Sequence, residues 1–500
     1  MSDIKDIKLR PSQEKVLKKM KEFIQSNDRI FILKGYAGTG KTTLMRFLIE
    51  YLNERKRLYK LLSPTGRAAK ILANYTGAKA DTIHSLIYHY QSFNRNIEEE
   101  SDLFGKDSKT NQLFLVFEPQ QREFKDYKDE EELKEVIYII DEASMVGDDI
   151  KRNVTQAMFG SGRLLYELLH YDSHPKSKYI FVGDPCQLPP VMESNSPALD
   201  SVYIRDTFNY AIQESQLTEI MRQKGDNSII SASTTIRKLW QQAPNSERVY
   251  DRAIIWGKLP LREYKDIYLV NDVKQMQEKY LQDVKQHGYN HSIFICRSNK
   301  DCVTISGNIR EKLGFTKTIE KGDIFMVVQN QYTTGLMNGD MVEVIDVDNK
   351  IIRTPHNKFS TPLTFKSIKV RELFTKKEYT TLIIEETLIS QNNNLDSHQQ
   401  TNLFVDFIMR MKEKGITEKK KPQQFTDALR RDVYLNALRC SYGYAVTCHK
   451  AQGGEWNNVY IHLGARNFTK NPIKSTYQWI YTAITRAKEK VFMVDDFYIK

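Results

Sequence analysis

Apolar residues in the first third of the chain form short continuous runs rather than a strict alternation with polar residues. Such runs stand at 30–33, 136–140 and 179–182, and stretches with helical spacing separate them. Strands that are buried on both faces of a parallel sheet have this pattern, because helices cover both faces. The first third therefore predicts a doubly wound α/β domain.

A second set of apolar runs predicts another parallel sheet in the second half of the chain. These runs stand at 293–296, 459–462 and 491–494. Between them, residues 340–390 alternate apolar and polar positions, which is typical of antiparallel strands. This segment predicts a small β-barrel inserted in a second α/β domain. Residues 391–435 are polar and rich in lysine, with apolar residues at helical spacing.

Length and charge refine this division. A chain of 500 residues exceeds one hydrophobic core, which agrees with two or more domains. Residues 86–133 carry twelve acidic and six basic residues, whereas the whole chain has a net charge of +11. The acidic window is expected to be an insertion between core strands. The basic excess fits a nucleic-acid partner, and it equally fits a surface of solvated lysines.

Cysteine spacing and hydropathy indicate a cytoplasmic protein. The five cysteines include no CxxC pair, which argues against a zinc ribbon or a disulfide framework and suits a reducing compartment. No apolar run approaches the length of a membrane span, and residues 1–10 are too polar for a signal peptide. We therefore expect no membrane association.

The strongest local motif is a GxxxxGK[ST] match between a predicted strand and a predicted helix. Its residues are Gly35, Tyr36, Ala37, Gly38, Thr39, Gly40, Lys41 and Thr42. Backbone N–H groups of such a loop surround phosphate oxygens, and the helix N-terminus adds partial positive charge. Lys41 is expected to reach the β- and γ-phosphates of ATP, and Thr42 to ligate Mg²⁺.

Two further segments follow predicted buried strands and complete a nucleotide site. Asp141 and Glu142 follow the run 136–140. Asp141 is expected to hold Mg²⁺ and Glu142 to deprotonate the attacking water. An acidic pair after a strand is otherwise an ordinary loop start, so the P-loop strengthens this interpretation. Gln187, in the segment GDPCQLPP, is expected to sense the γ-phosphate.

These motifs, taken in order with several others, resemble superfamily 1B helicases, in the branch of the Dda-like, RecD-like and Pif-like enzymes. The additional matching segments are LRPSQ at 9–13, SPTGRAA at 63–69, TIHS at 82–85, LTEIMRQ at 217–223, GDIFM at 322–326, NGD at 338–340, AVTCHKAQG at 445–453 and YTAITRA at 481–487. The order of these segments over most of the chain makes a chance match improbable.

The resemblance implies roles for residues that spacing alone does not assign. Gln13 corresponds to the glutamine that reads the adenine edge, and Arg222 and Arg486 to the arginine fingers. Without the motifs, either arginine would be taken for a surface ion pair. The residues that would contact the phosphates and sugars of a single strand are Thr65 and His84 in the first domain and Thr447, His449 and Lys450 in the second.

The resemblance also implies an architecture of two RecA-like P-loop NTPase domains, an inserted pin-type element and an inserted SH3-like barrel. The expected bounds are 1–85 with 134–205 for the first RecA-like domain, 86–133 for the acidic insertion that carries the pin, 206–337 with 436–500 for the second RecA-like domain, and 338–435 for the barrel with its helical insertion. The residues considered for the pin are Phe104, Phe114 and Phe117, each of which is otherwise a local core residue. Residues 391–435 either brace the barrel against the acidic insertion or form a solvated helical pair.

The function implied by the resemblance is that of an ATP-dependent DNA helicase. It would move 5′ to 3′ on single-stranded DNA and displace the complementary strand at a duplex fork, with ATP and Mg²⁺ as cofactors. One chain carries all the motifs, so a monomer suffices. Two alternatives remain: an RNA-directed or non-unwinding translocase, and a nucleotide-switched scaffold in a replication or recombination complex.

Overall fold

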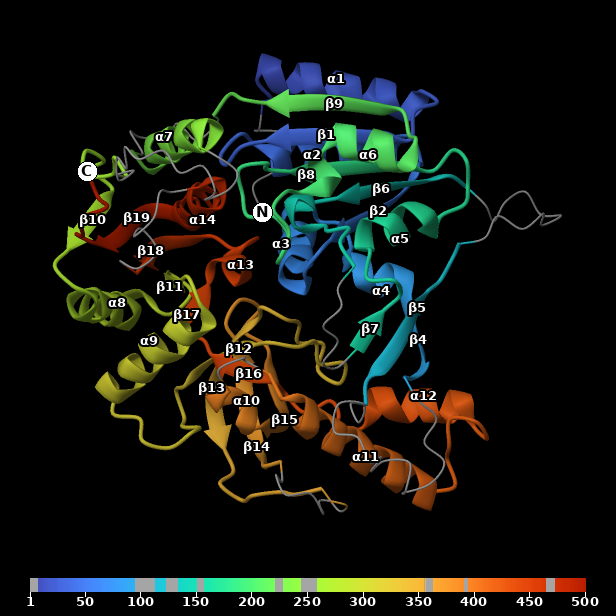
Figure 1. Ribbon diagram of the computed structural model, residues 1–500, viewed down its shortest axis with the longest axis vertical. Helices are drawn as coiled ribbons and strands as arrows, with labels where there is room; N and C mark the ends of the chain where they lie inside the picture. Colours follow the sequence, from blue (N-terminus) through green and yellow to red (C-terminus); the bar gives the residue numbers. More distant parts are fainter. Residues whose placement is uncertain are drawn as a thin grey trace, which may run out of the picture.

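The computed structural model contains two parallel sheets beside one another, with an antiparallel sheet and two long helices below them (Figure 1). It describes residues 8–94, 113–122, 134–150, 157–220, 228–243, 259–354, 356, 363–390, 394–464 and 473–500. The two α/β units with parallel sheets that the apolar runs predict are both present.

The first sheet is entirely parallel. Its strands, in spatial order, are β3 (Ala80–Thr82), β2 (Leu58–Ser63), β6 (Val136–Ile140), β8 (Lys178–Gly183), β1 (Ile30–Gly35) and β9 (Ile212–Leu217). Successive residues of β1 point to opposite faces, so that Phe31 and Leu33 join one buried cluster and Ile30 and Ile32 another. Both faces are therefore apolar, as the continuous runs require.

Helices cover both faces of this sheet. One cluster contains residues of α1 (Pro11–Gln25), α2 (Lys41–Glu54) and α3 (Gly66–Thr76). The other contains residues of α4 (Ile83–Ile87), α5 (Leu164–Tyr171), α6 (Ser201–Phe208) and the short 3₁₀ helices η3 (Ala143–Met145) and η4 (Pro197–Leu199). Each helix buries its apolar side and leaves polar residues outside.

The first sheet extends further along the chain than the expected boundary at residue 205. Strand β9 pairs with β1 in parallel register, from Ile30 opposite Ile212 to Gly35 opposite Leu217. Only Ser215 and Leu217 of β9 are buried, because β9 forms an edge of the sheet. An edge strand without an apolar run carries little signal in the sequence, which explains the displaced boundary.

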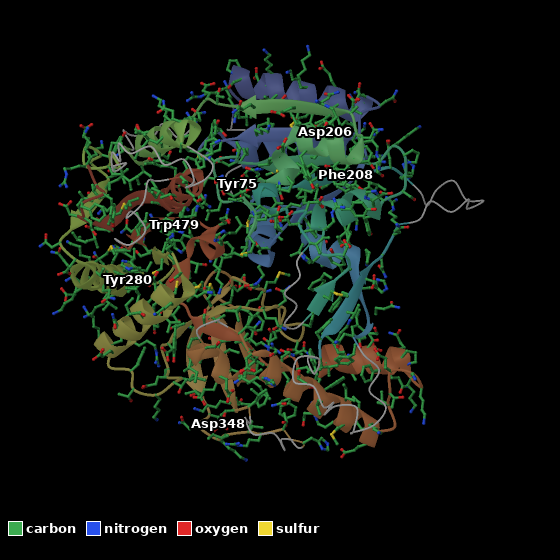
Figure 2. All side chains as sticks on the ribbon, in the orientation of Figure 1. Tyr75, Asp206, Phe208, Tyr280, Asp348 and Trp479 are labelled. Carbon is green, nitrogen blue, oxygen red and sulfur yellow. The ribbon has the colours of Figure 1, made fainter. Side chains whose placement is uncertain are left out.

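The second sheet is also parallel. Its strands, in spatial order, are β10 (Ile267–Val270), β19 (Ala487–Val494), β18 (Trp456–His462), β11 (Ser292–Cys296) and β17 (Ala445–Thr447). The helices of this unit are α7 (Ser228–Gln242), α8 (Val273–His287), α9 (Asn299–Lys312), α13 (Cys448–Ala451) and α14 (Lys474–Ile484). Tyr280 and Trp479 lie within it (Figure 2), and the Tyr280 ring packs 5.4 Å from that of Tyr460.

The segment that alternates apolar and polar residues forms an antiparallel sheet. Its strands, in spatial order, are β15 (Glu378–Ile384), β14 (Phe365–Glu372), β13 (Met341–Val347), β12 (Ile324–Val327) and β16 (Cys440–Tyr442), and the short helix α10 (Glu386–Ile389) follows β15. Strand β12 enters this sheet from the second α/β unit, and its neighbour β16 leads back to that unit. The chain therefore leaves and rejoins the second unit at adjacent strands.

The described part of the acidic insertion is a hairpin. Strands β4 (Tyr88–Phe93) and β5 (Leu115–Pro119) are antiparallel, and β7 (Ala157–Phe159) joins β5. The Phe117 ring stacks 4.9 Å from Phe159 and lies 5.9 Å from Tyr90, as a local packing residue. Phe114 is half-buried directly before β5, where its carbonyl oxygen accepts the backbone N–H of Asn94, directly after β4. Phe104 lies outside the described residues.

Helices α11 (Ser397–Glu413) and α12 (Pro422–Arg431) join the hairpin to the antiparallel sheet. The Phe93 ring of β4 lies 5.2 Å from Phe404, and the same buried cluster contains Phe365 and Ile384 of the sheet. The Tyr90 hydroxyl donates a hydrogen bond of 2.7 Å to a carboxylate oxygen of Glu418. Of the two arrangements considered for residues 391–435, the structure has the bracing one.

No helix of the described chain is both long enough and apolar enough to cross a bilayer.

The bracing contact can be tested at Phe404, whose side chain is 2% exposed. Replacing a buried aromatic ring with Ala costs about 3–5 kcal/mol. We expect Phe404→Ala to lower the midpoint of urea unfolding, whereas Phe374→Ala, at a ring that is 59% exposed, should change it little. Equal midpoints for both variants would contradict the packing of α11 against the hairpin.

Candidate active site

The loop between β1 and α2 has the backbone of a phosphate-binding loop. Gly38 and Gly40 have φ angles of 76° and 78°, in the left-handed region that glycine adopts without strain. Gly35 is required by space, because a Cβ there would lie 2.8 Å from Thr39 Oγ1. The loop leads into the N-terminus of α2, where unpaired N–H groups and the helix dipole favour an anion.

Lys41 lies against this loop and supplies the local positive charge. Its ammonium donates hydrogen bonds to the carbonyl oxygens of Gly35 (2.8 Å) and Tyr36 (3.2 Å). The Thr39 hydroxyl also donates to the Tyr36 carbonyl, at 2.8 Å. These bonds hold the loop in its curved form from within.

Gln13, at the start of α1, is buried against the same loop. Its side-chain amide donates to the Thr39 carbonyl oxygen at 3.3 Å, and its amide oxygen accepts the backbone N–H of Arg10 at 3.2 Å. Gln13 is 1% exposed. The structure therefore brings the predicted adenine-reading residue to the P-loop.

Asp141 and Glu142 follow β6 at the carboxyl edge of the first sheet. Burial and the neighbouring charge of Glu142 raise the pKa of Asp141 to about 7, and the charge of Lys41 opposes this shift. Glu142 has a φ of 52°, which non-glycine residues seldom adopt. The raised pKa means that Asp141 is short of positive charge, and a divalent cation would provide it.

The loop after β8 brings a third set of polar groups to this edge. Asp184 is buried, and burial raises the pKa of its carboxyl against the opposing charges of Lys41 and Arg486. Gln187 is 4% exposed, and its side-chain oxygen has no hydrogen-bond partner among the described residues. A buried and unpaired amide is a group that a ligand can satisfy.

Helix α14 of the second unit contacts the P-loop directly. The hydroxyl of Tyr481 accepts the backbone N–H of Ala37 at 2.9 Å and donates to a carboxylate oxygen of Asp184 at 2.8 Å. Tyr481 thus connects the P-loop of the first unit to the loop after β8. It is buried and belongs to the same apolar cluster as Tyr36.

The loop after β8 makes further hydrogen bonds to the second unit. The Thr482 hydroxyl accepts the backbone N–H of Leu188 at 3.0 Å, and Gln452 donates to the Leu188 carbonyl oxygen at 3.2 Å. Gln478 donates to the Gln187 carbonyl oxygen at 3.2 Å. The second unit therefore holds this loop at three points.

Arg486, just after α14, is a buried cation that donates hydrogen bonds to uncharged groups. Its guanidinium donates to the carbonyl oxygens of Thr482 (3.1 Å) and Gly454 (3.2 Å) and to the Thr485 hydroxyl (3.3 Å). It is 5% exposed, and no carboxylate in the described part of the chain pairs with it. Arg486 is therefore not a surface ion pair. Arg222 lies outside the described residues.

The two strand-contact candidates of the first unit also have local structural contacts. Thr65 is the N-cap of α3 and accepts the backbone N–H of Ala68 at 3.3 Å. The His84 ring of α4 lies 5.2 Å from Phe159 and 5.4 Å from Tyr88, at the base of the hairpin. Both are half-buried.

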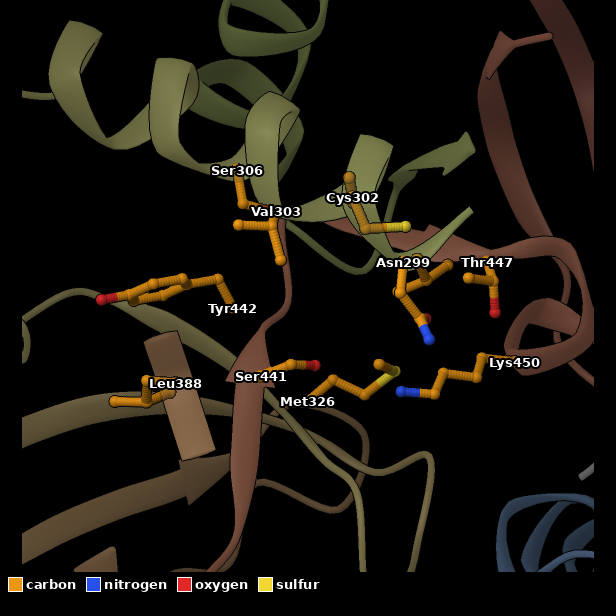
Figure 3. A pocket seen from close by; sticks show the side chains of 12 residues that line it. Asn299, Cys302, Val303, Ser306, Met326, Leu388, Ser441, Tyr442, Thr447 and Lys450 are labelled. Carbon is orange, nitrogen blue, oxygen red and sulfur yellow. The ribbon is translucent and has the colours of Figure 1, made fainter. Parts of the chain in front are cut away.

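The candidates of the second unit, Thr447, His449 and Lys450, stand together where β17 passes into α13. Burial lowers the pKa values of both His449 and Lys450. Thr447 and Lys450 line a pocket with Met326 and Ser441, and the Lys450 side chain extends toward Met326 (Figure 3). His449 is therefore favoured in its neutral form, as a hydrogen-bonding group rather than a cation.

Helix α3 makes a second contact between the units. The Arg67 guanidinium donates to the Gly339 carbonyl oxygen at 3.2 Å and lies 4.7 Å from the Trp456 ring. Lys70 pairs with Asp340. Burial lowers the pKa of Arg67 to about 10. The segments at 63–69 and 338–340, matched separately in the sequence, thus meet in space.

Several of these residues were absent from the sequence-based site. Tyr481, Thr482 and Gln452 stand inside matched motifs, and Gln478 lies one turn earlier on α14. All four side chains are polar and buried in the structure, and a buried polar side chain needs a partner. The sequence does not indicate which partner that is.

Comparisons with known proteins agree with this geometry. The AAA domain family matches residues 8–242, and the UvrD-like helicase C-terminal domain matches residues 442–494. The chain is 25% identical over 489 residues to the ATP-dependent DNA helicase dda of Enterobacteria phage T4, covering 92% of this chain and 93% of that protein. It is 23% identical over 519 residues to the RecBCD enzyme subunit RecD of Buchnera aphidicola, covering 97% of this chain and 73% of that protein.

A solved structure of a Bacteroides Pif1 helicase, in complex with ADP-AlF3 and single-stranded DNA, is similar over 98% of this chain and 93% of that one, with 19% identity and a TM-score of 0.45. The family matches fall on the two parallel-sheet units, in the order that the sequence motifs require. The chain therefore contains an AAA domain followed by a UvrD-like helicase C-terminal domain, and over most of its length it is similar to Dda-like and RecD-like helicases.

Proposed function

We propose that this protein is an ATP-dependent DNA helicase that moves 5′ to 3′ on single-stranded DNA and displaces the complementary strand. The observation that carries this proposal is the contact of Tyr481 with both Ala37 and Asp184. It places a residue of the second parallel-sheet unit inside the nucleotide site of the first. A nucleotide that changes this contact changes the relative position of the two units.

At the nucleotide site, Gln13 binds the adenine edge of ATP, and the residues of the P-loop hold its phosphates. These residues are Gly35, Ala37, Gly38, Thr39, Gly40 and Lys41. Thr42 and Asp141 are the residues that would hold Mg²⁺, since hydroxyl and carboxylate oxygens are its preferred ligands. Mg²⁺ would neutralise charge on the β- and γ-phosphates.

Hydrolysis then requires a base and positive charge near the γ-phosphate. Glu142 takes the proton of the attacking water. Arg486, which has no anionic partner among the described residues, is available to stabilise the charge that develops on the phosphoryl oxygens. Arg222 is assigned the same role from its motif. Gln187 donates a hydrogen bond from its side-chain NH2 group to the γ-phosphate and responds to the loss of that phosphate.

Movement along DNA follows from two sets of strand contacts, one in each unit, that hold the strand in turn. Thr65 and His84 of the first unit, and Thr447, His449 and Lys450 of the second, contact the phosphates and sugars of one strand. When ATP closes the units, one set slides along the strand while the other holds it. Contacts of this kind position a backbone without reading bases, so no sequence preference is expected.

The remaining parts separate the duplex. Hairpin β4–β5, braced by α11 and α12, is the pin-type element, and the antiparallel sheet with its helical insertion, within 338–435, is the SH3-like barrel. The two parallel-sheet units are the RecA-like domains, the first ending after β9 rather than at residue 205. One chain carries both halves of the nucleotide site, so a monomer suffices.

The two alternatives differ in what they require of the site. A nucleotide-switched scaffold does not need a base or an arginine finger, whereas Glu142 and a buried Arg486, which forms no salt bridge within the described part of the chain, are both present. An RNA-directed translocase uses the same backbone contacts. Direct comparison of DNA and RNA substrates distinguishes this alternative.

Loss of Arg486 tests the finger role. We expect Arg486→Ala to lower the kcat of single-strand-stimulated ATP hydrolysis by roughly 10²–10³-fold, with a smaller change in the KM for ATP, because the charge that it stabilises develops late. Steady-state ATPase assays measure both. Arg262→Ala is the matched control, since Arg262 pairs with Asp495 on the surface. A variant that loses only ATP affinity contradicts the role.

Loss of the Tyr481 hydroxyl tests the link between the units. Tyr481→Phe leaves the Ala37 N–H and Oδ2 of Asp184 unpaired between the two units, at a cost of about 1–3 kcal/mol. We expect kcat to fall roughly 5- to 150-fold, together with the number of strands displaced per ATP hydrolysed. Tyr477→Phe, on the same helix, is the matched control. Unchanged coupling in Tyr481→Phe would show that the hydroxyl does not transmit the nucleotide state.

Matched duplexes that carry a single tail test the function as a whole. We expect ATP-dependent displacement of a DNA duplex with a 5′ tail, and none of a blunt or 3′-tailed duplex. Lys41→Ala should abolish displacement and hydrolysis while single-strand binding persists. Displacement from the 3′-tailed substrate alone would overturn the polarity, and equal ATPase rates with and without single-stranded DNA would favour the scaffold. Displacement of RNA but not DNA duplexes would favour the RNA-directed alternative.

A further inference from the structure

Two histidines and an aspartate meet where α8 ends and β11 begins. Asp283 and His287 lie four residues apart on α8, on the same side of the helix. Gly288 then takes a φ of 84°, which reverses the chain and returns His291 over the last turn of the helix. The His291 N–H donates to the Gly288 carbonyl oxygen at 3.1 Å, so this turn is fixed.

Asp283 is held in place by groups of neighbouring strands. One carboxylate oxygen, Oδ2, accepts hydrogen bonds from the Ser292 hydroxyl, from the Asn458 side-chain amide at 2.7 Å and from the Tyr460 hydroxyl at 3.1 Å. The other oxygen, Oδ1, faces His291. A carboxylate whose second oxygen is already anchored has the support that metal ligands usually have.

The distances within the cluster are those of groups that surround an ion rather than bond to one another. His291 Nε2 lies 3.9 Å from Asp283 Oδ1, which is too far for a hydrogen bond. The rings of His287 and His291 are 4.5 Å apart, and one donor atom from each of the three residues lies within 4.8 Å of the others.

We propose that Asp283, His287 and His291 bind one divalent transition-metal ion of the zinc type, with water as the fourth ligand. Imidazole nitrogen and carboxylate oxygen at about 2.0–2.2 Å are its usual donors, and a tetrahedral site places them about 3.3 Å apart. His287 is exposed, so its side chain is free to rotate by the small amount required. Mg²⁺ and Ca²⁺ prefer oxygen donors and do not fit two imidazoles.

The ion would act as a structural clamp of the second parallel-sheet unit. It joins the end of α8 to the start of β11, and the anchored oxygen of Asp283 extends the link to Asn458 and Tyr460 on β18. The carboxyl end of β11, Cys296, pairs with Thr447, so the cluster occupies the opposite edge of the sheet from the strand-contact candidates. The clamp is therefore independent of the nucleotide chemistry.

The test uses the full chain without an affinity tag, first stripped of metal with a chelator. Zn²⁺ is titrated by calorimetry, and Co²⁺ by its visible absorption, which becomes intense in a tetrahedral site. We expect one ion per chain, and a rise in the thermal midpoint of about 5–10 °C at a hundredfold excess over the Kd. Chelation should reverse this rise.

Substitutions locate the site. His287→Ala and His291→Ala should each abolish the thermal shift and the cobalt band, while His398→Ala, at an exposed histidine of α11, should bind as the original chain does. Circular dichroism without metal shows that the variants fold, and the exposed His287 is the safest position. Binding that persists in the double variant, or no binding by the original chain, would overturn the proposal. Neither outcome depends on whether the protein unwinds DNA.

Discussion

The hydroxyl of Tyr481 is the point at which two separately built parallel sheets become one site. It accepts a P-loop N–H and donates to Asp184, so neither loop is fully satisfied until the second unit is in place. Because polar groups that are buried between the two units need hydrogen-bond partners there, the units fit together in few positions. Thr482 and Gln478 make further hydrogen bonds to the loop that contains Asp184. Hydrogen bonds, as well as apolar contacts, therefore fix the relative placement of the two units.

Aromatic packing joins the hairpin β4–β5 to helices α11 and α12. The aromatic cluster of Phe93, Phe404 and Phe425 joins three segments that are remote in sequence, and it holds the hairpin in place from outside. A duplex exerts a force on the element that separates its strands, and a two-stranded hairpin has little stability of its own. Support from α11 and α12 is therefore what would allow the hairpin to resist such a load without bending.

The sequence predicted features formed by neighbouring residues better than contacts between residues that are far apart in the chain. The P-loop, Asp141 and Gln187 follow apolar runs that identify buried strands, so both their existence and their edge of the sheet could be inferred. Tyr481 meets Ala37 across 444 positions, and no spacing rule reaches that far. The end of the first domain was predicted at residue 205, before β9, because an edge strand needs no apolar run. Similarly, Asp283, His287 and His291 are spaced four residues apart, but the spacing does not show that the turn at Gly288 returns His291 over the end of α8.

The adjacency of β12 and β16 has a consequence for how such a chain diversifies. Phe325 lies opposite Tyr442, so more than a hundred residues depart from and return to one place. A loop whose ends already touch changes length at little entropic cost. The intervening segment is thus free to lengthen or shorten while α14 keeps its contacts with the P-loop and with the loop after β8. A change confined to this segment leaves the hydrogen bonds of Tyr481, Thr482 and Gln478 to the first unit in place.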